Sequence, residues 1–466
     1  MKTDAPGGTQ SVVVTDEDRP RGREGGLEAP ERHPVAWRDP DFFDASSLER
    51  ELVRTFEICQ GCRRCFSLCE TFPTLFDAID GGATGQADAL TPKDMDRVVA
   101  ECYLCDLCFM TKCPYVPPHP FNLDFPHLML RAKATRFREG RVPKRDRILT
   151  ATDAVGRFLG IPIVAQTVNR LNRSPSLRRL TEGWTGIHAE ALLPPFSPTS
   201  LQAKLKHHRS DLPVVATTDT RGKIALFGTC YGRHLKPEIG IDLVAVFEHN
   251  GIPVTLVEGE VCCGMPKLEI GDLDSIDALR RRNIPILRAA VEAGFDLTAP
   301  IPSCVLMFKQ ELPLLYPEDR DVQIVARAFF DPFDYLVRRH RAGHFRTDFV
   351  CSLGHVAYHV PCHLRVQNLG LRTRDILALV PGTELEVIER CSGHNGTYAV
   401  RRETHDQAMK IGRPVFRRVA EAHPDHYTSD CPMAQDHIHQ GLGPNAKVPE
   451  HPLALLRLAY GLTEPA

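Results

Sequence analysis

Two groups of cysteines have the spacing of iron-sulfur ligands. The first group forms the pattern C-x2-C-x2-C-x3-C and consists of Cys59, Cys62, Cys65 and Cys69. The second group precedes Pro114, forms C-x2-C-x2-C-x4-C, and consists of Cys102, Cys105, Cys108 and Cys113. Three cysteines two residues apart wrap the backbone around a cubane, and the fourth ligand then comes from farther away. We therefore expect two 4Fe-4S clusters.

The fourth cysteine of each motif is expected to bind the cluster of the other motif, as it does in two-cluster ferredoxins. One cluster would then be held by Cys59, Cys62, Cys65 and Cys113. The other would be held by Cys102, Cys105, Cys108 and Cys69. Zinc also takes four thiolates, but zinc sites normally use two C-x2-C pairs rather than three consecutive gaps. The spacing therefore favours iron-sulfur clusters.

The second half of the chain repeats a pattern in which cysteines follow apolar strands. In the first copy these are Cys230, Cys262, Cys263 and Cys304. In the second copy they are Cys362, Cys391 and Cys431. Ligands in α/β domains bind outside the carboxyl ends of the strands, so we expect the cysteines of each copy to converge.

With these motifs the sequence resembles the cysteine-rich CCG domain family from about residue 45 to the end. This family occurs in heterodisulfide reductase subunits, in the C subunit of anaerobic glycerol-3-phosphate dehydrogenase, and in iron-sulfur subunits of lactate and glycolate oxidases. Its full pattern is a cysteine, a Cys-Cys-Gly and a closing C-x2-C, whose cysteines hold a further iron-sulfur centre. The resemblance also implies that the N-terminal motifs belong to the α-helical type of ferredoxin.

Both copies depart from the full pattern of the family. The first has Met307 at the closing position and keeps four thiolates; the second has Ser392 in its doublet and keeps three. Sites that split disulfides in this family resemble five-thiolate centres, so disulfide reduction is not implied. The first copy could hold a cluster. The second could hold a cluster or zinc with His363 or His394 as fourth ligand, or its cysteines could be small buried hydrophobes.

The first hypothesis is an iron-sulfur oxidoreductase subunit that serves a quinone, thiol or protein acceptor between the two copies. No G-x-G-x-x-G follows a strand, so a flavin or nicotinamide would sit on a partner, and the resemblance implies a flavin-containing dehydrogenase. The alternative is an electron carrier or docking scaffold, in the service of a rubrerythrin-like peroxide-reducing system. A pocket lined by Cys230, Cys263, Cys304 and Cys391 would favour the enzyme. The sequence identifies no catalytic residue.

The elements that must position these cysteines predict an α+β multidomain chain. A helix behind Ser46 and Ser47 leads to Cys59, and Thr91-Pro92 opens another before Cys102. We divide the chain into a disordered tail (1–43), an α-helical ferredoxin domain (44–130), a helical basic connector (131–218), a first CCG domain (219–345) and a second, degenerate one (346–466). The basic run at 131–147 is either a solvated helix face or a docking patch for an acidic partner.

Overall composition excludes some classes of function. The formal net charge is −2 with a sequence pI near 6.8, which gives no electrostatic argument for nucleic acid. The N-terminal residues contain no apolar stretch typical of a secretory signal, and no run of about 18 apolar residues occurs. We expect a cytoplasmic protein, with peripheral attachment to the inner face of the membrane left open.

Overall fold

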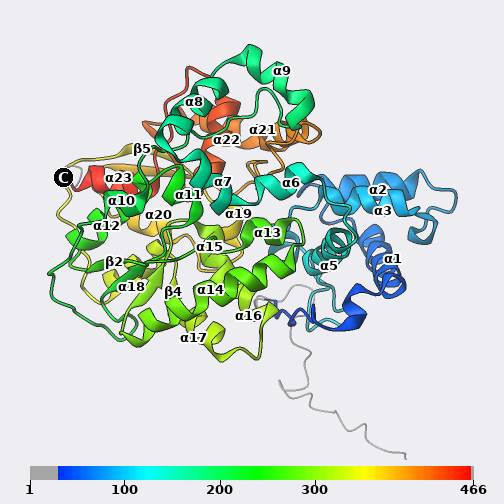
Figure 1. The fold of residues 1–466 in the computed structure, drawn as a ribbon, viewed down its shortest axis with the longest axis horizontal. Coiled ribbons are helices and arrows are strands. Elements are labelled where there is room, and N and C mark those ends of the chain that lie inside the picture. The colour runs from blue at the N-terminus through cyan, green and yellow to red at the C-terminus, as the bar shows by residue number, and fades with distance from the viewer. Residues whose placement is uncertain (1–29, 463–466) are drawn as a thin grey trace, which may run out of the picture.

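Residues 30–462 are described by a computed structural model, which has a helical N-terminal part and two small parallel sheets. The N-terminal helices α1–α3 lie at one end of the molecule and the sheet-containing domains at the other (Figure 1). The expected α+β arrangement, with a helical ferredoxin-type domain before two α/β repeats, is confirmed. None of the helices within 30–462 combines the length and the apolar character needed to cross a bilayer.

The ferredoxin-type domain is built from helices whose apolar faces meet in one core. These helices are α1 (Ala45–Cys62), α2 (Thr71–Asp80), α3 (Pro92–Glu101), α4 (Leu107–Thr111) and α5 (Phe125–Arg138). Phe56 and Phe76 are buried in that core. The carboxylate of Asp44 accepts a hydrogen bond from the amide of Ser47 at 2.7 Å and caps α1. The prediction that Ser46 or Ser47 caps this helix is wrong, because both residues lie inside its first turn.

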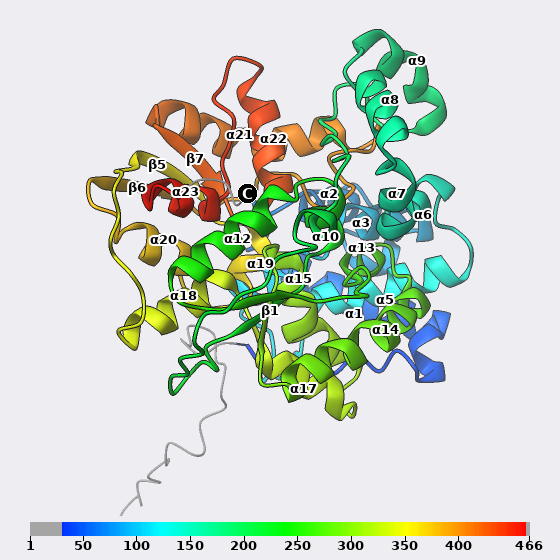
Figure 2. The ribbon, with the colours of Figure 1, turned by 60° about the vertical axis from the view of Figure 1, so that its left-hand side comes forward.

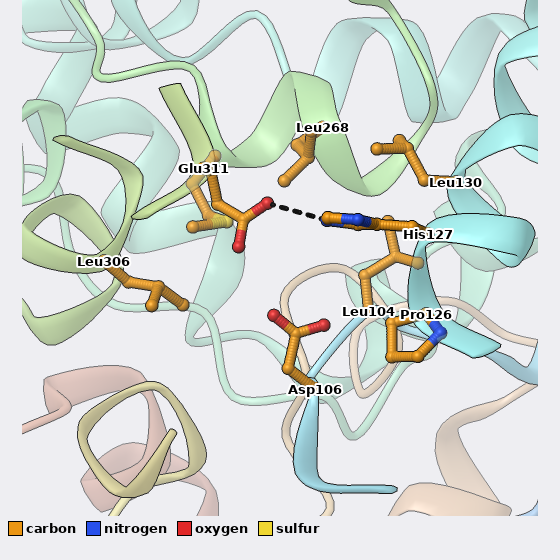
Figure 3. A pocket seen from close by; sticks show the side chains of 9 residues that line it. Leu104, Asp106, Pro126, His127, Leu130, Leu268, Leu306 and Glu311 are labelled. Carbon is orange, nitrogen blue, oxygen red and sulfur yellow. Dashed lines mark ion pairs between the residues drawn. The ribbon is translucent and has the colours of Figure 1, made fainter. Parts of the chain in front are cut away.

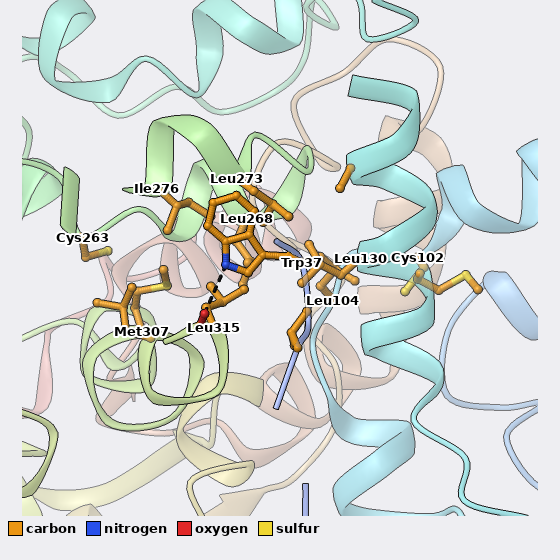
Figure 4. Packing of buried hydrophobic residues seen from close by; sticks show 14 of the residues in the cluster. Trp37, Cys102, Leu104, Leu130, Cys263, Leu268, Leu273, Ile276, Met307 and Leu315 are labelled. Atoms are coloured by element: carbon orange, nitrogen blue, oxygen red, sulfur yellow. Dashed lines mark hydrogen bonds between the residues drawn. The ribbon is translucent and has the colours of Figure 1, made fainter. Parts of the chain in front are cut away.

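Residues 30–43 are packed against the protein, whereas the sequence predicted a disordered tail over 1–43. Val35, Trp37 and Phe42 are buried. The indole N–H of Trp37 donates to the carbonyl of Leu315 at 3.1 Å, so the segment joins the ferredoxin helices to the first repeat (Figure 4). The prediction is wrong for this stretch because its contacts are with residues far along the chain. Residues 1–29 lie outside the described part.

The connector is helical, as its patterning indicated. It contains α6 (Lys144–Leu149), α7 (Thr152–Leu159), α8 (Pro162–Asn172), α9 (Pro175–Thr185) and α10 (Leu201–Lys204). α8 and α9 project from the body of the molecule, away from the sheets (Figure 2). The basic run at 131–147 differs along its length: Arg141 is exposed and pairs with Asp96 at 3.0 Å, as on a solvated helix face, whereas Arg145 is largely covered and pairs with Glu403 at 2.6 Å. The docking patch remains a prediction.

The first repeat contains a parallel sheet in the order β2-β1-β3-β4. Its strands are β1 (Ile224–Leu226), β2 (Val254–Leu256), β3 (Asp296–Thr298) and β4 (Phe329–Phe330). Its helices include α11 (Cys230–His234), α12 (Glu238–His249), α13 (Met265–Glu269), α14 (Leu273–Glu292), α15 (Pro302–Leu306), α16 (Leu312–Leu315), α17 (Arg320–Ala328) and α18 (Pro332–Arg341). Parallel strands place all their carboxyl ends at one edge, so the loops that carry the cysteines meet there.

The second repeat contains a three-stranded parallel sheet in the order β6-β5-β7. Its strands are β5 (Gly354–His359), β6 (Thr383–Ile388) and β7 (His426–Ser429). Its helices are α19 (Cys362–Arg365), α20 (Arg372–Leu377), α21 (His405–Ala422), α22 (Pro432–Leu442) and α23 (Pro452–Ala459). Leu453 and Leu456 of α23 share one buried cluster with Leu243 and Phe247 of α12. The cores of the two repeats are therefore joined.

Candidate redox site

The first cysteine group lies where α1 ends and the chain turns toward α2. Cys59 and Cys62 are on the last turn of α1, and Arg63 adopts a left-handed conformation at φ 52° to end it. The amide of Arg63 donates to the carbonyl of Cys59 at 2.8 Å, and that of Leu68 donates to Cys65 at 3.0 Å. Cys69 follows shortly before α2. The helix thus delivers two cysteines, and the turn after it delivers the others.

The second group is held by a loop between α3 and α4. Cys102 caps the end of α3. Leu104 and Asp106, on either side of Cys105, both have positive φ, at 53° and 62°. These left-handed residues tighten the loop so that alternate side chains face the same centre. Cys108 lies on the short helix α4, and its carbonyl accepts the amide of Cys113 at 2.9 Å.

The fourth cysteine of the second group, Cys113, lies beside the first group. Burial raises the pKa of the Cys59 thiol well above its usual value, and the neighbouring thiols of Cys113, Cys65 and Cys62 raise it further. Cys113 therefore lies with the first three cysteines; that it binds their cluster remains a prediction.

Cys69 correspondingly lies with the second group. Burial raises the pKa of Cys69 to about 12, with a further contribution from Cys102. Burial also raises the pKa of Cys108, next to Cys65, Cys105, Cys102 and Cys69. Because Cys108 is near both Cys65 and Cys69, the two thiol groups are adjacent.

The chemistry of these groups fits iron-sulfur clusters. All the cysteines are free thiols, and thiolates crowded in a buried site are stable only beside a cation. Zinc sites normally use two C-x2-C pairs, whereas a cluster takes three cysteines at two-residue gaps and spreads its ligands over separate irons.

In the first repeat the four expected cysteines converge at the carboxyl edge of the sheet. Cys230 begins α11 after β1, Cys262 and Cys263 follow β2, and Cys304 lies on α15 after β3. Hydrogen bonds from the thiols of Cys230 and Cys263 lower the pKa of Cys262, which lies between them. The thiol of Cys304 is next to Cys263. Met307, at the place of a fifth cysteine, is fully buried near Cys263 (Figure 4).

In the second repeat the three expected cysteines also meet. Burial raises the pKa of the Cys362 thiol, with Cys391 and Cys431 as charged neighbours. The sulfur of Cys391 accepts a hydrogen bond from the amide of Gly393 at 3.3 Å and lies 3.7 Å from the side-chain amide nitrogen of Asn395. Amide donors of this kind stabilise a thiolate.

The histidines near these cysteines differ in what their ring nitrogens bond. His363 has its Nδ1 bonded to the Ser303 hydroxyl at 2.8 Å, and His359 is bonded to Ser429 and to the carbonyl of Arg390. The Nε2 of His394 is buried without a hydrogen-bond partner among residues 30–462. Of His359, His363 and His394, therefore, His394 has a ring nitrogen that is left for a ligand.

Cys351 belongs to none of the cysteine groups. The sequence predicted a core position for it, because it matches no position of either repeat. The structure shows it exposed, in the segment that precedes β5. That prediction is wrong, and Cys351 has no part in the site.

Both repeats open onto one large cavity of about 480 Å³. Its wall includes thiols of both repeats, namely Cys230, Cys263, Cys304, Cys362, Cys391 and Cys431. The pocket predicted to favour an enzyme is therefore present. The connector supplies part of the wall through Leu149, Val155, Leu159 and Val168. Sequence reasoning missed this contribution, although the apolar spacing of α7 and α8 was a usable signal.

The second ferredoxin group adjoins this cavity directly. Tyr103 and Cys105 are part of the cavity wall, and the hydroxyl of Tyr103 lies 3.9 Å from the sulfur of Cys391. Burial raises the pKa of the Cys105 thiol, and the neighbouring thiol of Cys362 raises it further. Thiols of the ferredoxin-type domain and of the second repeat are therefore neighbours.

A buried ion cluster supports the loop between Cys105 and Cys108. Arg32 pairs with Asp106 at 2.7 Å, with Asp124 at 2.9 Å and with Glu311 at 3.5 Å. His127 lies 3.1 Å from Asp124 and 3.6 Å from Glu311 (Figure 3). Four segments meet here, from the N-terminal segment to the first repeat. No local pattern in the sequence indicates this cluster, because its members are up to 279 residues apart.

Family models divide the chain as the geometry does. Residues 52–139 match the Citrate utilization protein B Fer4-like domain, and residues 224–309 and 356–435 each match the Cysteine-rich domain known as CCG. The chain thus contains a Fer4-like domain followed by two CCG domains, as the sequence resemblance predicted.

Its relatives include proteins that belong to oxidoreductase complexes. It is 27% identical over 347 residues to the C subunit of anaerobic glycerol-3-phosphate dehydrogenase from Escherichia coli K12, covering 73% of this chain and 83% of the relative. It is 29% identical over 247 residues to the B subunit of fumarate reductase (CoM/CoB) from Methanothermobacter marburgensis, covering 51% and 46%. It is 29% identical over 189 residues to lactate utilization protein A of Bacillus pumilus, covering 38% and 75%.

Proposed function

We propose that this chain is the iron-sulfur subunit of a cytoplasmic oxidoreductase complex, with two 4Fe-4S clusters and a site for an electron acceptor or donor between its CCG domains. The observation that carries this proposal is the cavity of about 480 Å³, because it brings six thiols of both repeats to one space beside Tyr103 and Cys105. An electron carrier without a substrate site needs no such space. When bound, the clusters would supply one-electron transfer between a partner and the cavity.

The protein's own residues create two different environments for the two ferredoxin groups. Phe66, within the first group, has 55% of its surface exposed, so this group faces a partner. Cys102, in the second group, is buried, and Tyr103 and Cys105 place this group at the wall of the cavity. The partner we propose is a flavin-containing dehydrogenase, because relatives of this chain are named as subunits of glycerol-3-phosphate dehydrogenase and fumarate reductase.

The cavity also offers an acceptor a polar side chain to bond. His234 lines the cavity, and its Nε2 is buried and unpaired among residues 30–462. Burial lowers its pKa to about 4, so at neutral pH the ring is uncharged and its free nitrogen can bond a polar group of the acceptor.

Each CCG domain is proposed to hold a further centre. In the first, the ligands would be Cys230, Cys262, Cys263 and Cys304, whose thiols are already in contact in a chain. In the second, they would be Cys362, Cys391 and Cys431, with His394 as the better fourth donor. His394 has a free ring nitrogen, whereas His363 is bonded to Ser303.

Metal analysis tests these assignments. Iron, acid-labile sulfide and zinc are measured per chain on anaerobically purified protein, with low-temperature EPR after reduction. About twelve irons or more, with a signal that Cys263→Ser removes, would support the site in the first CCG domain; about eight would leave only the ferredoxin clusters and favour the carrier. Cys351→Ser is the matched control, since Cys351 is exposed and outside every group.

A further inference from the structure

Helices α7–α9 expose apolar side chains where a water-facing helix would carry polar ones. Nine of the sixteen large hydrophobic residues that are exposed within 30–462 lie between positions 148 and 192. Ile163, Leu180 and Trp184 are the extremes, with 79%, 78% and 89% of their surfaces exposed. A contiguous exposed apolar surface on a soluble protein marks an interaction site. This stretch lies between the two family matches, which end at 139 and resume at 224.

The polarity of α9 is reversed. Leu177, Leu180 and Trp184 occupy positions i, i+3 and i+7 and therefore share one face, and all three are exposed. Arg178, in contrast, is buried, and its guanidinium donates to the carbonyls of His188 and Ala191 at 2.6 and 2.9 Å. The helix is thus held to the protein by its charged residue and turns its apolar face outward.

The same surface is positively charged. Residues 144–185 contain eight lysines and arginines against three acidic residues. Of the basic residues, Arg178 is buried and Arg145 is paired with Asp146 and Glu403. Arg170, Arg173 and Arg179 are exposed and make no ion pair with any residue of 30–462. Basic helices with exposed tryptophan and leucine are typical of segments that lie in the interface of an anionic membrane.

The cavity reaches the surface at this face. Ile148 and Leu192 line the cavity and are also exposed, at 61% and 41%. Val155 and Val168, on the same helices as the exposed residues Phe158 and Ile163, face the cavity from the inside. α7 and α8 therefore separate the cavity from whatever covers their outer side.

We propose that the outer face of α7–α9, defined by Phe158, Ile163, Leu171, Leu177, Leu180 and Trp184, docks on an anionic lipid bilayer. Charge and apolar surface together select a bilayer, since a second copy of this face would bring arginines against arginines. The docked cavity then opens toward the hydrocarbon layer. Its substrate would be a lipid-dissolved carrier of the quinone class; this last step rests on the proposed function, whereas the docking surface does not.

Vesicle co-sedimentation tests the docking surface on the full-length protein. Vesicles of equal parts phosphatidylglycerol and phosphatidylcholine are compared with phosphatidylcholine alone. We expect binding to the anionic vesicles that weakens with salt, and a loss of about tenfold or more in Leu180→Ser/Trp184→Ser. Val350→Ser/Val448→Ser is the matched control, because these residues are 69% and 76% exposed and lie outside α7–α9. Equal binding by both double variants, or none by the unaltered protein, overturns the proposal.

Tryptophan fluorescence gives a second readout without a variant that could fail to fold. The chain has two tryptophans; Trp37 is buried, whereas Trp184 is 89% exposed. Anionic vesicles should therefore shift the emission of Trp184 to shorter wavelength. An unchanged emission spectrum would overturn the proposal. So would a dimer in sedimentation velocity that becomes a monomer in Leu180→Ser/Trp184→Ser, because the face would then be a contact between two copies. Iron content and EPR are independent of this result, so a failure here is distinct from a failure of the proposed function.

Discussion

At the scale of single residues, Gly264 explains why a glycine follows the cysteine doublet. Its φ is +103°, and a Cβ placed there would be 3.3 Å from the terminal carbon of Met307. We expect Gly264→Ala to destabilise the protein by about 1–3 kcal/mol and to displace Cys263. Thermal unfolding and iron content measure the two effects. Gly183→Ala is the control, since Gly183 has no positive φ and nothing within 4 Å; an equal loss there would contradict this explanation.

The buried guanidinium of Arg32 is expected to be the most sensitive charge in the N-terminal segment. Arg32→Met leaves Asp106, Asp124 and Glu311 without their shared cation, and breaking a buried pair costs about 3–5 kcal/mol. Arg38, on the same segment, pairs with Asp277 at 3.0 Å but is 59% exposed. Arg38→Met should cost about 0–1 kcal/mol. Urea unfolding of both variants makes the comparison, and similar costs would contradict it.

His127 gives the stability of this ion cluster a pH dependence. Burial and Arg32 lower its pKa, but Asp124 and Glu311 outweigh them and raise it to about 9. A folded pKa above the ordinary value of about 6.5 means that the contribution is complete below about pH 6.5 and is lost as the pH rises through about 9.

The stabilisation that is lost when His127 gives up its proton is expected to be on the order of 3 kcal/mol. We expect the free energy of unfolding of the unaltered protein to fall between about pH 6.5 and 9.5 by that much more than in His127→Gln. Urea unfolding at the two pH values measures the difference. Parallel pH profiles for the two proteins would show that His127 is uncharged in the folded state.

At the scale of elements, the start of α3 positions Cys102. Thr91 and Asp94 form a reciprocal capping box, so Thr91→Ala should cost about 1 kcal/mol. Lys93, exposed in the same turn, offers a comparison, because Lys93→Ala should change stability by no more than about 0.5 kcal/mol. Differential scanning calorimetry distinguishes the two. An undiminished melting temperature in Thr91→Ala would place the stabilisation of α3 elsewhere.

Elements with a strong local pattern could be predicted, and those defined by distant contacts could not. The strands β1, β2, β5, β6 and β7 and the helices before Cys59 and Cys102 follow from apolar spacing and capping residues. The segment 30–43 has no periodicity, and its order depends on Arg32 and Trp37 meeting residues 74 to 279 positions away. The ferredoxin cysteines were found from their spacing, and those of the CCG domains from their position after apolar strands and from the family resemblance. Tyr103 and the walls from α7 and α8 required the packed fold.

At the scale of the whole molecule, the two CCG domains behave as one body because α23 closes the core of the first. Leu456 is fully buried in the cluster that contains Leu243 and Phe247, whereas Leu458 on the same helix is 42% exposed. Leu456→Ala should cost about 2–5 kcal/mol, and Leu458→Ala should cost much less.

Because the cores are joined, Leu456→Ala should lower the unfolding midpoint of both CCG domains together. Hydrogen exchange at β1 and β5 reports on the two sheets separately. Faster exchange in both, with no change in Leu458→Ala, would show that the two domains on either side of the cavity unfold as one unit. Faster exchange confined to β5 would mean that the domains unfold independently, and the cavity would then change shape as they move.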